Sequence, residues 1–417
     1  AVIACDQFTQ DRSYWEGIQN ALGGAPSTFN IILPEIYLND NRDRRIRDIH
    51  RTMAAYLEEV LAPPRRGCVY VERSTPFHPR RRGLVFALDL EQYDWQNGSC
   101  LLARSTEDTV AERLPPRMEV RRDASLESPH VLLLIDDDED ALLPALGKRA
   151  GETAPAYHAK LRAGSGELSG WFLETEADWT LLAEGLEALA RRAENRYGSG
   201  VSGKPFLYAV GDGNHSLASA KGVWEEYKLR RRGEPGLEHH PARWALVELE
   251  NLYDPGLSFE PIHRLIFGAA AGEMLDCLSA LPGFTSRPAA DREELSGFVE
   301  TAGTGKNRLG LISGGGGPAF TLVETEAPGL APVSLQPLLD QLLRSRRDCS
   351  IDYIHGKDAL FRLALDPGRT VSGILLPPVN KNGLFQTIAA GGPLPRKSFS
   401  MGEAEEKRFY FECRKLF

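Results

Sequence analysis

The sequence contains no run of about 18 apolar residues, the length that a membrane-spanning helix requires. Its first residues, AVIACDQFTQ, lack the charged and then apolar stretches of a secretory signal. The six cysteines form no C-x-x-C pair and no short ladder, which argues against a disulfide framework and a zinc knuckle. We therefore expect a cytoplasmic protein with reduced thiols and no association with a membrane.

Lysine is also scarce, because the chain has 38 arginines but only 11 lysines, none of them before Lys148. Biased nucleotide composition of the genome explains such a ratio without any function. Alternatively, some arginines line an anion site, since a planar and permanently charged guanidinium suits phosphate and carboxylate groups. The net charge of -9 and the absence of an extended basic block argue against a nucleic-acid partner.

The 417 residues suffice for two or three domains with a substantial core. Apolar runs alternate irregularly with stretches of helical periodicity, which favours an α+β fold over a doubly wound sheet or a barrel. The most suggestive motifs end with EPIHR (260–264), so we place the boundary to a second lobe near residue 268. The predicted strands are 29–38, 67–73, 83–91, 130–136, 205–212, 243–251, 308–313 and 373–379, and the clearest predicted helices are 40–61, 176–197, 214–232 and 334–346.

The segment 206–232 has the densest group of glycine and polar residues. An apolar strand runs directly into GDGNHS (211–216), and a helix follows. Glycines permit positive φ and the close approach of a ligand, and free N–H groups at a helix N-terminus favour an anion. We therefore expect Asp212 to hold a metal or accept a proton, and His215 to contact a phosphate or act in acid–base chemistry.

Two other interpretations of this turn stay open. Asp and Ser are common N-cap residues and Asp-Gly is common in turns, so the segment also fits a capped tight turn without function. GDGNHS resembles G-x-G-x-x-G as well, with Ser216 at the third glycine. A dinucleotide fold is nevertheless the weaker alternative, because no strand ending in Asp or Glu follows about 20 residues later.

A second cluster lies at 104–122, where arginines and hydroxyl residues share a stretch interrupted by prolines. Such a composition suits the binding of a phosphate or a carboxylate. A solvated surface with local ion pairs explains most of these residues equally well. We single out Arg104, Glu107 and Arg113 as candidates for substrate binding.

Charged residues elsewhere are further candidates. Glu35 interrupts the apolar stretch 29–38, and either faces water or is a buried carboxylate suited to act as a general base. The acidic run 136–140 ends a predicted strand, where Mg²⁺ could bind, although a solvated turn is the more common outcome. The loop 391–400 could place Arg396 and Lys397 on a phosphate.

The chain resembles a widespread bacterial family that is catalogued only as a domain of unknown function, number ten-fifteen. The resemblance rests on long motifs that span nearly the whole sequence: ACDQFT (4–9), LPEIYL (33–38), GLVFALDLEQY (83–93), RSTEDTVAERLPPR (104–117), GDGNHSLASAK (211–221), EPIHR (260–264) and LPRKSFSMGEAEEKRFY (394–410).

Many members carry Asp-Gly-His-His-Arg at the central turn, which is similar to the motif of free serine kinases in the ParB and sulfiredoxin superfamily. The resemblance therefore implies a ParB/sulfiredoxin-like mixed α/β catalytic region over 1–267, and an α+β region over 268–417 that contributes the basic loop 391–400. In those kinases the turn handles nucleotide phosphates, and a carboxylate elsewhere is the proposed base. Glu35 is the candidate for that base here.

The match to the kinase motif is incomplete. Asp212, Gly213 and His215 agree with it, whereas Asn214 replaces its first His and Ser216 replaces its Arg. Because Ser supplies only a neutral donor where Arg supplies a permanent charge, either another cation compensates or the phosphate role is altered. The candidates for that cation are Arg104, Arg396 and Lys397.

The resemblance implies a small-molecule kinase that transfers a phosphoryl group from ATP or ADP to the hydroxyl of free L-serine or a similar compound. Mg²⁺ would bridge the donor phosphates. The alternative is a nucleotide- or metabolite-binding regulatory protein that has lost catalysis. The implied site has catalytic Asp212, His215 and Glu35, phosphate-binding Gly213, Asn214, Ser216, Arg396 and Lys397, substrate-binding Arg104, Glu107 and Arg113, and Asp212 as metal ligand.

Overall fold

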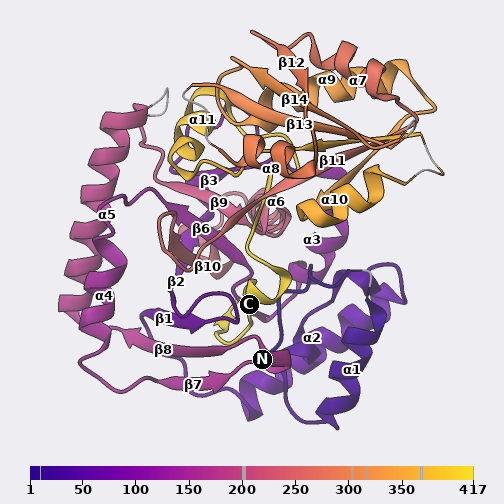
Figure 1. Cartoon of the computed structure of the whole chain (residues 1–417). Coiled ribbons are helices and arrows are strands. Elements are labelled where there is room, and N and C mark those ends of the chain that lie inside the picture. The colour runs from indigo at the N-terminus through magenta and orange to yellow at the C-terminus, as the bar shows by residue number, and fades with distance from the viewer. Residues whose placement is uncertain are drawn as a thin grey trace. The chain divides into compact units, whose positions relative to one another are not determined.

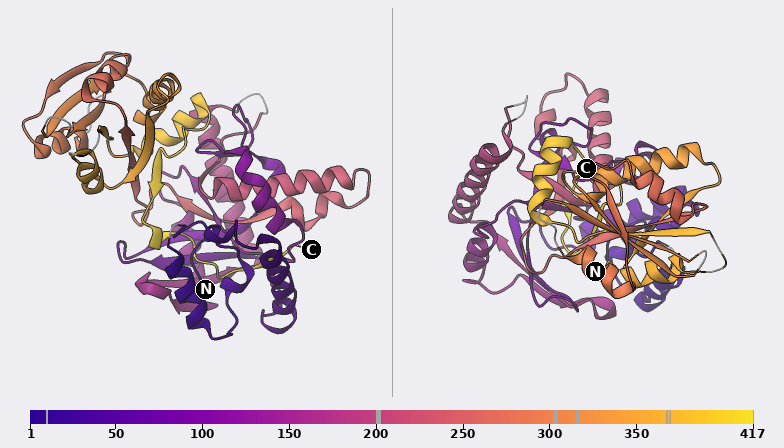
Figure 2. Two further views of the ribbon diagram at one scale, coloured as in Figure 1. Left: turned by 90° about the vertical axis from the view of Figure 1, so that its right-hand side faces the viewer. Right: turned by 45° about the horizontal axis from the view of Figure 1, so that its top comes forward.

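The computed structural model describes residues 1–9, 11–199, 203–301, 305–314, 317–366, 368 and 370–416. The chain forms two compact units, which are shown in Figures 1 and 2. The first contains Ala1–Leu257 and Gly402–Phe417, and the second contains Ser258–Met401. This division differs from the predicted one near residue 268, because the strand Phe259–Phe267 pairs with strands of the second unit and the C-terminal segment returns to the first.

The first unit is a mixed sheet with helices on both faces. The strands follow the order β3-β4-β9-β6-β10-β2-β1-β8-β7, and β18 pairs separately with β5. Its helices are α1 (Arg12–Leu22), α2 (Arg42–Glu59), α3 (Leu114–Arg122), α4 (Leu142–Ala150), α5 (Glu176–Tyr197) and α6 (Asn214–Arg230). Its strands are β1 (Cys68–Ser74), β2 (Arg81–Asp89), β3 (Tyr93–Asp94), β4 (Ala103–Ser105), β5 (Leu126–Glu127), β6 (Val131–Ile135), β7 (Tyr157–Lys160), β8 (Glu167–Leu173), β9 (Tyr208–Asp212), β10 (Trp244–Asn251) and β18 (Arg414–Lys415).

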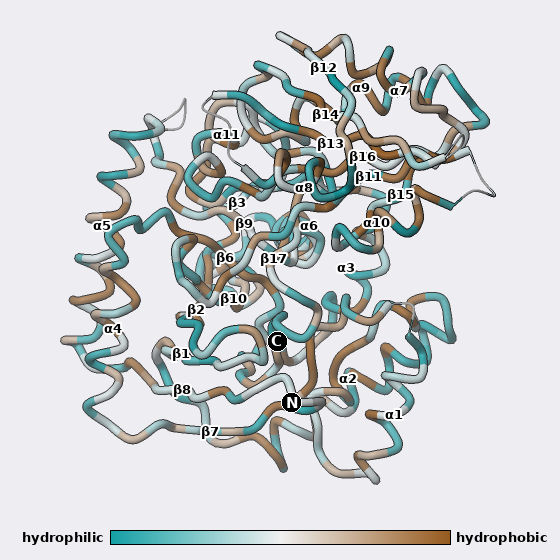
Figure 3. The backbone as a smooth tube through the Cα atoms, viewed as in Figure 1, coloured by the Kyte–Doolittle hydropathy of each residue, from teal (hydrophilic) through white to brown (hydrophobic). Residues whose placement is uncertain are grey.

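Both faces of this sheet are covered, so β6 is apolar along its length, whereas its neighbours β10 and β2 also bury charged residues such as Glu250 and Arg81. On β1 the side chain of Tyr70 packs on one face with α4, α5 and α6, whereas Val69 and Val71 pack on the other with α1 and α2. Each fully buried Val, Leu or Ile contributes about 1.5–3 kcal/mol to stability. Helices α2 and α5 show both teal and brown turns in Figure 3, as expected for helices with one face on a core.

Segments near the two ends of the chain pair with each other in the first unit. Ile3 forms an antiparallel bridge with Phe409, and the N–H of Tyr410 donates to the carbonyl of Val2 at 2.9 Å. The side chains of Val2, Ile3, Phe409 and Tyr410 all belong to the core that α1 and α2 cover. The end of the chain is therefore a structural part of the unit in which it began.

The second unit is a sheet in the order β12-β14-β13-β16-β11-β15, with β17 paired to β11. Together with the first unit it confirms the predicted α+β class. Its helices are α7 (Ala271–Leu278), α8 (Arg292–Glu300), α9 (Ala331–Ser345), α10 (Lys357–Ala364) and α11 (Leu384–Gly391). Its strands are β11 (Phe259–Phe267), β12 (Thr285–Pro288), β13 (Asn307–Ser313), β14 (Ala319–Thr325), β15 (Ser350–His355), β16 (Val371–Leu375) and β17 (Phe399–Met401).

One predicted strand is wrong. The apolar stretch 29–38 forms two short 3₁₀ helices, η1 (Thr28–Ile31) and η2 (Glu35–Tyr37), separated by Pro34. Proline has no N–H to donate to a strand partner and its φ favours a turn. In the described part of the chain we find no helix with the length and apolar character needed to cross a membrane.

Candidate functional site

The predicted strand–turn–helix at residues 206–232 is present, with β9 ending at Asp212 and α6 beginning two residues later. Gly213, between them, has φ 80° and ψ 26°, a left-handed conformation that favours glycine. A Cβ at this position would lie 3.1 Å from the Cα of Val131 and 3.1 Å from Cδ2 of His130. The turn therefore depends on Gly213 for its backbone conformation and for its close contact with β6.

No side chain caps the N-terminus of α6 in the described structure, because its N-cap residue is Gly213. The alternative of a turn capped by Asp or Ser is therefore wrong. The N–H groups of a first helical turn have no partner within the helix, and with the helix dipole they attract an anion. This turn carries Asn214, His215 and Ser216, the residues that the sequence assigned to phosphates.

The carboxylate of Asp212 lies beside a lysine from the end of the chain. Its Oδ1 accepts a hydrogen bond from the N–H of Gly213 at 2.9 Å, and its Oδ2 is 3.4 Å from Nζ of Lys407. The sequence placed Lys407 in a motif but gave no reason to assign it to this turn. Lys407 therefore supplies a positive charge beside Asp212, at the end of β9.

The segment that follows β4 lies against the same turn. Strand β4 runs parallel to β9, and the hydroxyl of Thr106 donates to the carbonyl of Val210 at 2.6 Å. The N–H of Val110 donates to Nε2 of His215 at 3.2 Å. Glu107 belongs to this segment, so the structure brings the RSTEDTV and GDGNHS motifs together.

Two polar atoms in these neighbouring segments are enclosed without a partner. Oδ1 of Asn214 and the hydroxyl oxygen of Thr109 have almost no exposed surface and no hydrogen-bond partner among the described residues. Buried polar atoms in folded proteins are nearly always paired, so such atoms are typical of places where a water or a ligand binds.

Arg104 does not reach this turn. Its Nε donates to the carbonyl of Leu101 at 3.1 Å, and its guanidinium lies 4.6 Å from the ring centre of Phe206, near the start of β9 rather than its end. Burial lowers the pKa of the Arg104 guanidinium. The geometry therefore gives no support to Arg104 as a substrate-binding or compensating cation.

A cleft of about 170 Å³ brings Glu35 and Ser216 together. The Glu35 carboxylate is 16% exposed, forms an ion pair with Arg117 and lies 3.5 Å from Nη2 of Arg113. Thus Glu35 and Arg113 are neighbours, although the sequence assigned them to different roles. The other residues of the cleft are Cys5, Ile31, Ile32, Leu33, Leu38, Met53, Arg117, Val120, Arg121, Ala124, Leu126, Glu127, Ser128, His130, Ser219, Tyr410 and Leu416.

His130 lines this cleft in a pair with Asp6 that sequence reasoning missed. Its Nε2 lies 3.3 Å from Oδ2 of Asp6, and its Nδ1 lies 2.6 Å from the hydroxyl of Tyr410. Burial disfavours the imidazolium, but Tyr410 and Asp6 outweigh it and raise the pKa of His130 well above its ordinary value. Burial also opposes charge on Asp6, yet His130 and a hydrogen bond from Gln7 lower the pKa of that carboxyl.

The basic loop 391–400 belongs to the second unit. Lys397 has φ 60°, and its carbonyl accepts a hydrogen bond from Nη1 of Arg264 at 3.0 Å. This bond uses the backbone of Lys397 to anchor the loop. The role of Arg396 and Lys397 at the phosphates stays a prediction.

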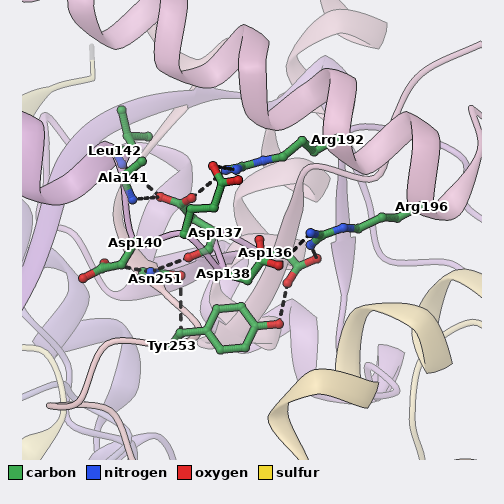
Figure 4. Close-up of polar contacts among 11 residues, drawn as sticks. Asp136, Asp137, Asp138, Asp140, Ala141, Leu142, Arg192, Arg196, Asn251 and Tyr253 are labelled. Atoms are coloured by element: carbon green, nitrogen blue, oxygen red, sulfur yellow. Dashed lines mark hydrogen bonds and ion pairs between the residues drawn. The ribbon is translucent and has the colours of Figure 1, made fainter.

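The acidic run 136–140 is held by arginines (Figure 4). Asp136 and Asp138 pair with Arg196 at 2.9 Å and 2.7 Å. Asp140 lies 2.7 Å from Arg82 and accepts a hydrogen bond from Asn251 at 2.9 Å. These carboxylates are therefore already neutralised by side chains of the same unit.

Asp137 is the buried member of this run and caps a helix (Figure 4). Its Oδ2 accepts from the N–H groups of Ala141 and Leu142 at 2.8 Å and 2.9 Å, and its Oδ1 lies 2.6 Å from Arg192. Nowhere in the described part of the chain do three or more His, Cys, Asp or Glu side chains gather to hold a metal. The run is structural in this geometry, and several of the abundant arginines are structural with it.

Comparison with known proteins gives the family. A family model described as "Protein of unknown function (DUF1015)" matches residues 1–340. The chain belongs to this family. No curated protein matches the sequence of this DUF1015 member.

Several solved structures resemble parts of the DUF1015 chain at low sequence identity. A free serine kinase in complex with AMP has 11% identity and a TM-score of 0.39, over 80% of this chain and 91% of the other. A conserved hypothetical protein from Pyrococcus furiosus has 13% identity and a TM-score of 0.37, over 80% and 97%. SbnI with a C-terminal truncation, from Staphylococcus aureus, has 10% identity and a TM-score of 0.37, over 76% and 82%.

Proposed function

We propose that this chain is a small-molecule kinase that transfers a phosphoryl group from ATP or ADP to the hydroxyl of free L-serine or a similar hydroxy compound. The observation that carries the proposal is that Ser216, in the uncapped first turn of α6, lines the same cleft as Glu35. A phosphate held at this helix end would therefore lie close to a carboxylate able to take a proton.

The donor phosphates would bind at the start of α6. The backbone N–H groups at Asn214 and Ser216 favour an anion, whereas that of Gly213 already donates to Asp212, and Lys407 adds a cation beside Asp212. Phosphoryl transfer needs mainly positioning and charge neutralisation, and this turn offers both.

The acceptor would bind in the cleft. Its hydroxyl oxygen attacks the terminal phosphorus of the donor, the bond from that phosphorus to the leaving nucleotide breaks, and Glu35 takes the hydroxyl proton. Arg113 is half exposed and 3.5 Å from Glu35, so it is placed to bind the carboxylate of an amino acid. Glu107, in the segment whose Val110 contacts His215, is the candidate for the substrate ammonium group.

Asp212 is the carboxylate that would hold Mg²⁺ here. Magnesium in nucleotide sites commonly takes one or two carboxylates together with phosphates and waters, and the 26% exposed Asp212 fits that use. A single carboxylate at the turn suits a metal shared with the nucleotide. When bound, Mg²⁺ would neutralise charge on the donor phosphates.

One observation favours a second function, a nucleotide- or metabolite-binding regulatory protein without catalysis. Glu35 forms ion pairs with both Arg113 and Arg117, so both guanidinium groups occupy the carboxylate that would have to take the proton of the acceptor. In the kinase, the substrate carboxylate would have to draw Arg113 away from Glu35. In the regulator, both pairs would persist when the ligand binds.

The two functions are separated by incubating the full chain with MgATP or MgADP and a panel of hydroxy amino acids, followed by phosphorus NMR. If the chain is a kinase, the wild type should form a phosphorylated product, and Asp212→Asn and His215→Ala should not. Asp276→Asn, which changes an exposed carboxylate of the second unit, should still form it. Turnover that survives both site substitutions would contradict the proposed site. Nucleotide binding without turnover on any acceptor would favour the regulator.

A further inference from the structure

A cysteine, an imidazole, a carboxylate and a phenol meet at one wall of the cleft. Sγ of Cys5 lies 3.9 Å from Nδ1 of His130, whose Nε2 lies 3.3 Å from Oδ2 of Asp6. The hydroxyl of Tyr410 is 2.6 Å from the same Nδ1 and accepts a hydrogen bond from the N–H of Cys5 at 3.1 Å. Cys5, His130 and Tyr410 all line the cleft.

Although Cys5 is near the start of the chain, the backbone on both sides of it is fixed. The N–H of Ala4 donates to the carbonyl of Arg408 at 2.8 Å, and the carbonyl of Cys5 accepts from the N–H of Glu35 at 2.8 Å. The thiol is therefore held in place by the C-terminal segment on one side and by the 3₁₀ helix of Glu35 on the other.

A pair of opposite charges, His130 and Asp6, lies beside the sulfur of Cys5. The imidazole of His130 is only 11% exposed, and Tyr410 and Asp6 raise its pKa, which keeps a positive charge 3.9 Å from the sulfur. The positive charge of Lys407 also lowers the pKa of the Asp6 carboxyl. The other charged side chains of the cleft are Glu35, Arg117, Arg121 and Glu127.

Three other cysteines lie in less activating surroundings. The thiol of Cys277 donates to the carbonyl of Leu338 at 3.8 Å, and burial raises its pKa. Burial raises the pKa of Cys68 to about 11 and also raises that of Cys413, whose sulfur lies 3.3 Å from the hydroxyl of Ser128. Cys5 is the cysteine whose sulfur the structure places beside an imidazole–carboxylate pair.

We propose that Cys5 is a nucleophilic thiol that forms a mixed disulfide with a low-molecular-weight disulfide entering the cleft. The thiolate attacks one sulfur of the disulfide, a bond forms between that sulfur and Sγ of Cys5, and the original S–S bond breaks. The departing thiolate receives the proton that His130 holds. Cys5 is oxidised and the small disulfide is reduced, so one small thiol is released for each protein thiol modified.

The adduct has a consequence that rests on the proposed function. Cys5 shares its cleft of about 170 Å³ with Glu35 and Ser216, so a group bound to the sulfur would occupy the space assigned to the acceptor. Modification of Cys5 would then inhibit phosphoryl transfer, and a reducing agent would restore it. The chemistry at the sulfur itself does not depend on that function.

The test is reaction of the protein with 2-hydroxyethyl disulfide, with the modified cysteine identified by peptide mass mapping. At pH 7 we expect Cys5 to react at least about 10-fold faster than Cys277. His130→Gln should slow the reaction of Cys5 at pH 7 by about 10-fold, with rates approaching those of the wild type at pH 9.5, where thiolate forms without the imidazolium. Cys277 in the same variant serves as the internal control for folding.

Either of two results would overturn the proposal: Cys5 reacting no faster than Cys277 in the wild type, or a Cys5 rate at pH 7 that His130→Gln leaves unchanged. The adduct on Cys5 is detected by mass spectrometry and not by enzyme activity. A failure of Cys5 to react can therefore be told apart from a failure of the kinase proposal. If Cys5 reacts but no acceptor is phosphorylated, the thiol site stands without the kinase.

Discussion

The N–H of Val110 donates a hydrogen bond to Nε2 of His215 at 3.2 Å. A backbone N–H can only donate, so Nε2 is an acceptor and the ring proton of His215 lies on Nδ1. This bond joins two motifs that lie about a hundred residues apart in the sequence. It favours His215 as a donor to a phosphate through Nδ1–H over His215 as a base at Nε2.

His215→Ala should therefore weaken nucleotide binding as well as the fold. We expect a loss of about 1 kcal/mol in the free energy of unfolding, because Val110 loses its acceptor, and a Kd for MgATP about 10-fold higher. Thr106→Val removes another hydrogen bond of the same segment, the one to Val210, without touching the first turn of α6. Calorimetric titration should give that control an unchanged Kd, and equal Kd values for both variants would contradict the assignment.

Gly213→Ala tests whether the turn needs glycine for its backbone or also for space. The φ of 80° costs about 1–2 kcal/mol for alanine, and the contacts at 3.1 Å with His130 and Val131 add a further cost. Gly233 has φ 88° but nothing within 4 Å of its Cβ position, so Gly233→Ala carries the backbone cost alone. Urea unfolding should show the larger loss for Gly213→Ala, and equal losses would mean that contact with β6 is unimportant.

Asp137→Asn should destabilise the first unit, because Asp137 caps α4 and pairs with Arg192 while only 1% exposed. We expect a loss of about 2–3 kcal/mol in the free energy of unfolding. Asp138→Asn is the matched control, since that side chain is 44% exposed in its pair with Arg196 and should cost less than about 0.5 kcal/mol. If Mg²⁺ stabilised the wild type but not Asp137→Asn, the acidic run would be a metal site instead.

The buried carboxyl of Glu250 should make the free energy of unfolding depend on pH. Its side chain is fully buried with Nε of Arg81 at 2.9 Å, and burial raises the pKa of its carboxyl to about 7. The folded protein then holds this proton more tightly than the unfolded chain, so the stabilisation is present below about pH 4.5 and is lost as the pH rises through about 7.

Glu250→Gln should remove this loss, which is on the order of 2 kcal/mol between pH 5 and 8. The measurement is thermal or urea unfolding of wild type and variant across that range. Glu260→Gln, an exposed carboxylate, is the control and should keep the slope of the wild type. A slope of the same size in Glu250→Gln would show that Glu250 is already ionised in the folded protein.

The sequence predicted elements best where local signals agree. The predicted helix at 176–197 matches α5, Glu176–Tyr197, because Thr175 and Asp178 form a capping box at its start and Gly198 follows its end. The stretch 29–38 failed because its apolar residues suggest a strand while Pro34 forces two 3₁₀ helices. Local sequence patterns therefore predict most helices and strands, but a single proline can prevent a strand that the apolar pattern predicts.

The candidate site could be predicted only in part, for a physical reason. The strand-to-helix turn at Gly213 is encoded by neighbouring residues, so it could be predicted from the sequence alone. Lys407 and His130 reach the same region through sheet pairing and through the return of the chain end to the first unit. Such long-range neighbours leave no periodic pattern, so the pairing of Glu35 with Arg117 was equally invisible.

The most direct test of the account is the rate at which phosphorus NMR detects phosphorylated acceptor in the wild type and in Glu35→Gln, with MgATP or MgADP as donor. The account predicts a fall of at least about 100-fold in Glu35→Gln with nucleotide affinity retained, because the cleft loses its base but the start of α6 is intact. Glu58→Gln, an exposed carboxylate of α2, should keep the wild-type rate. An unchanged rate in Glu35→Gln would contradict the central claim.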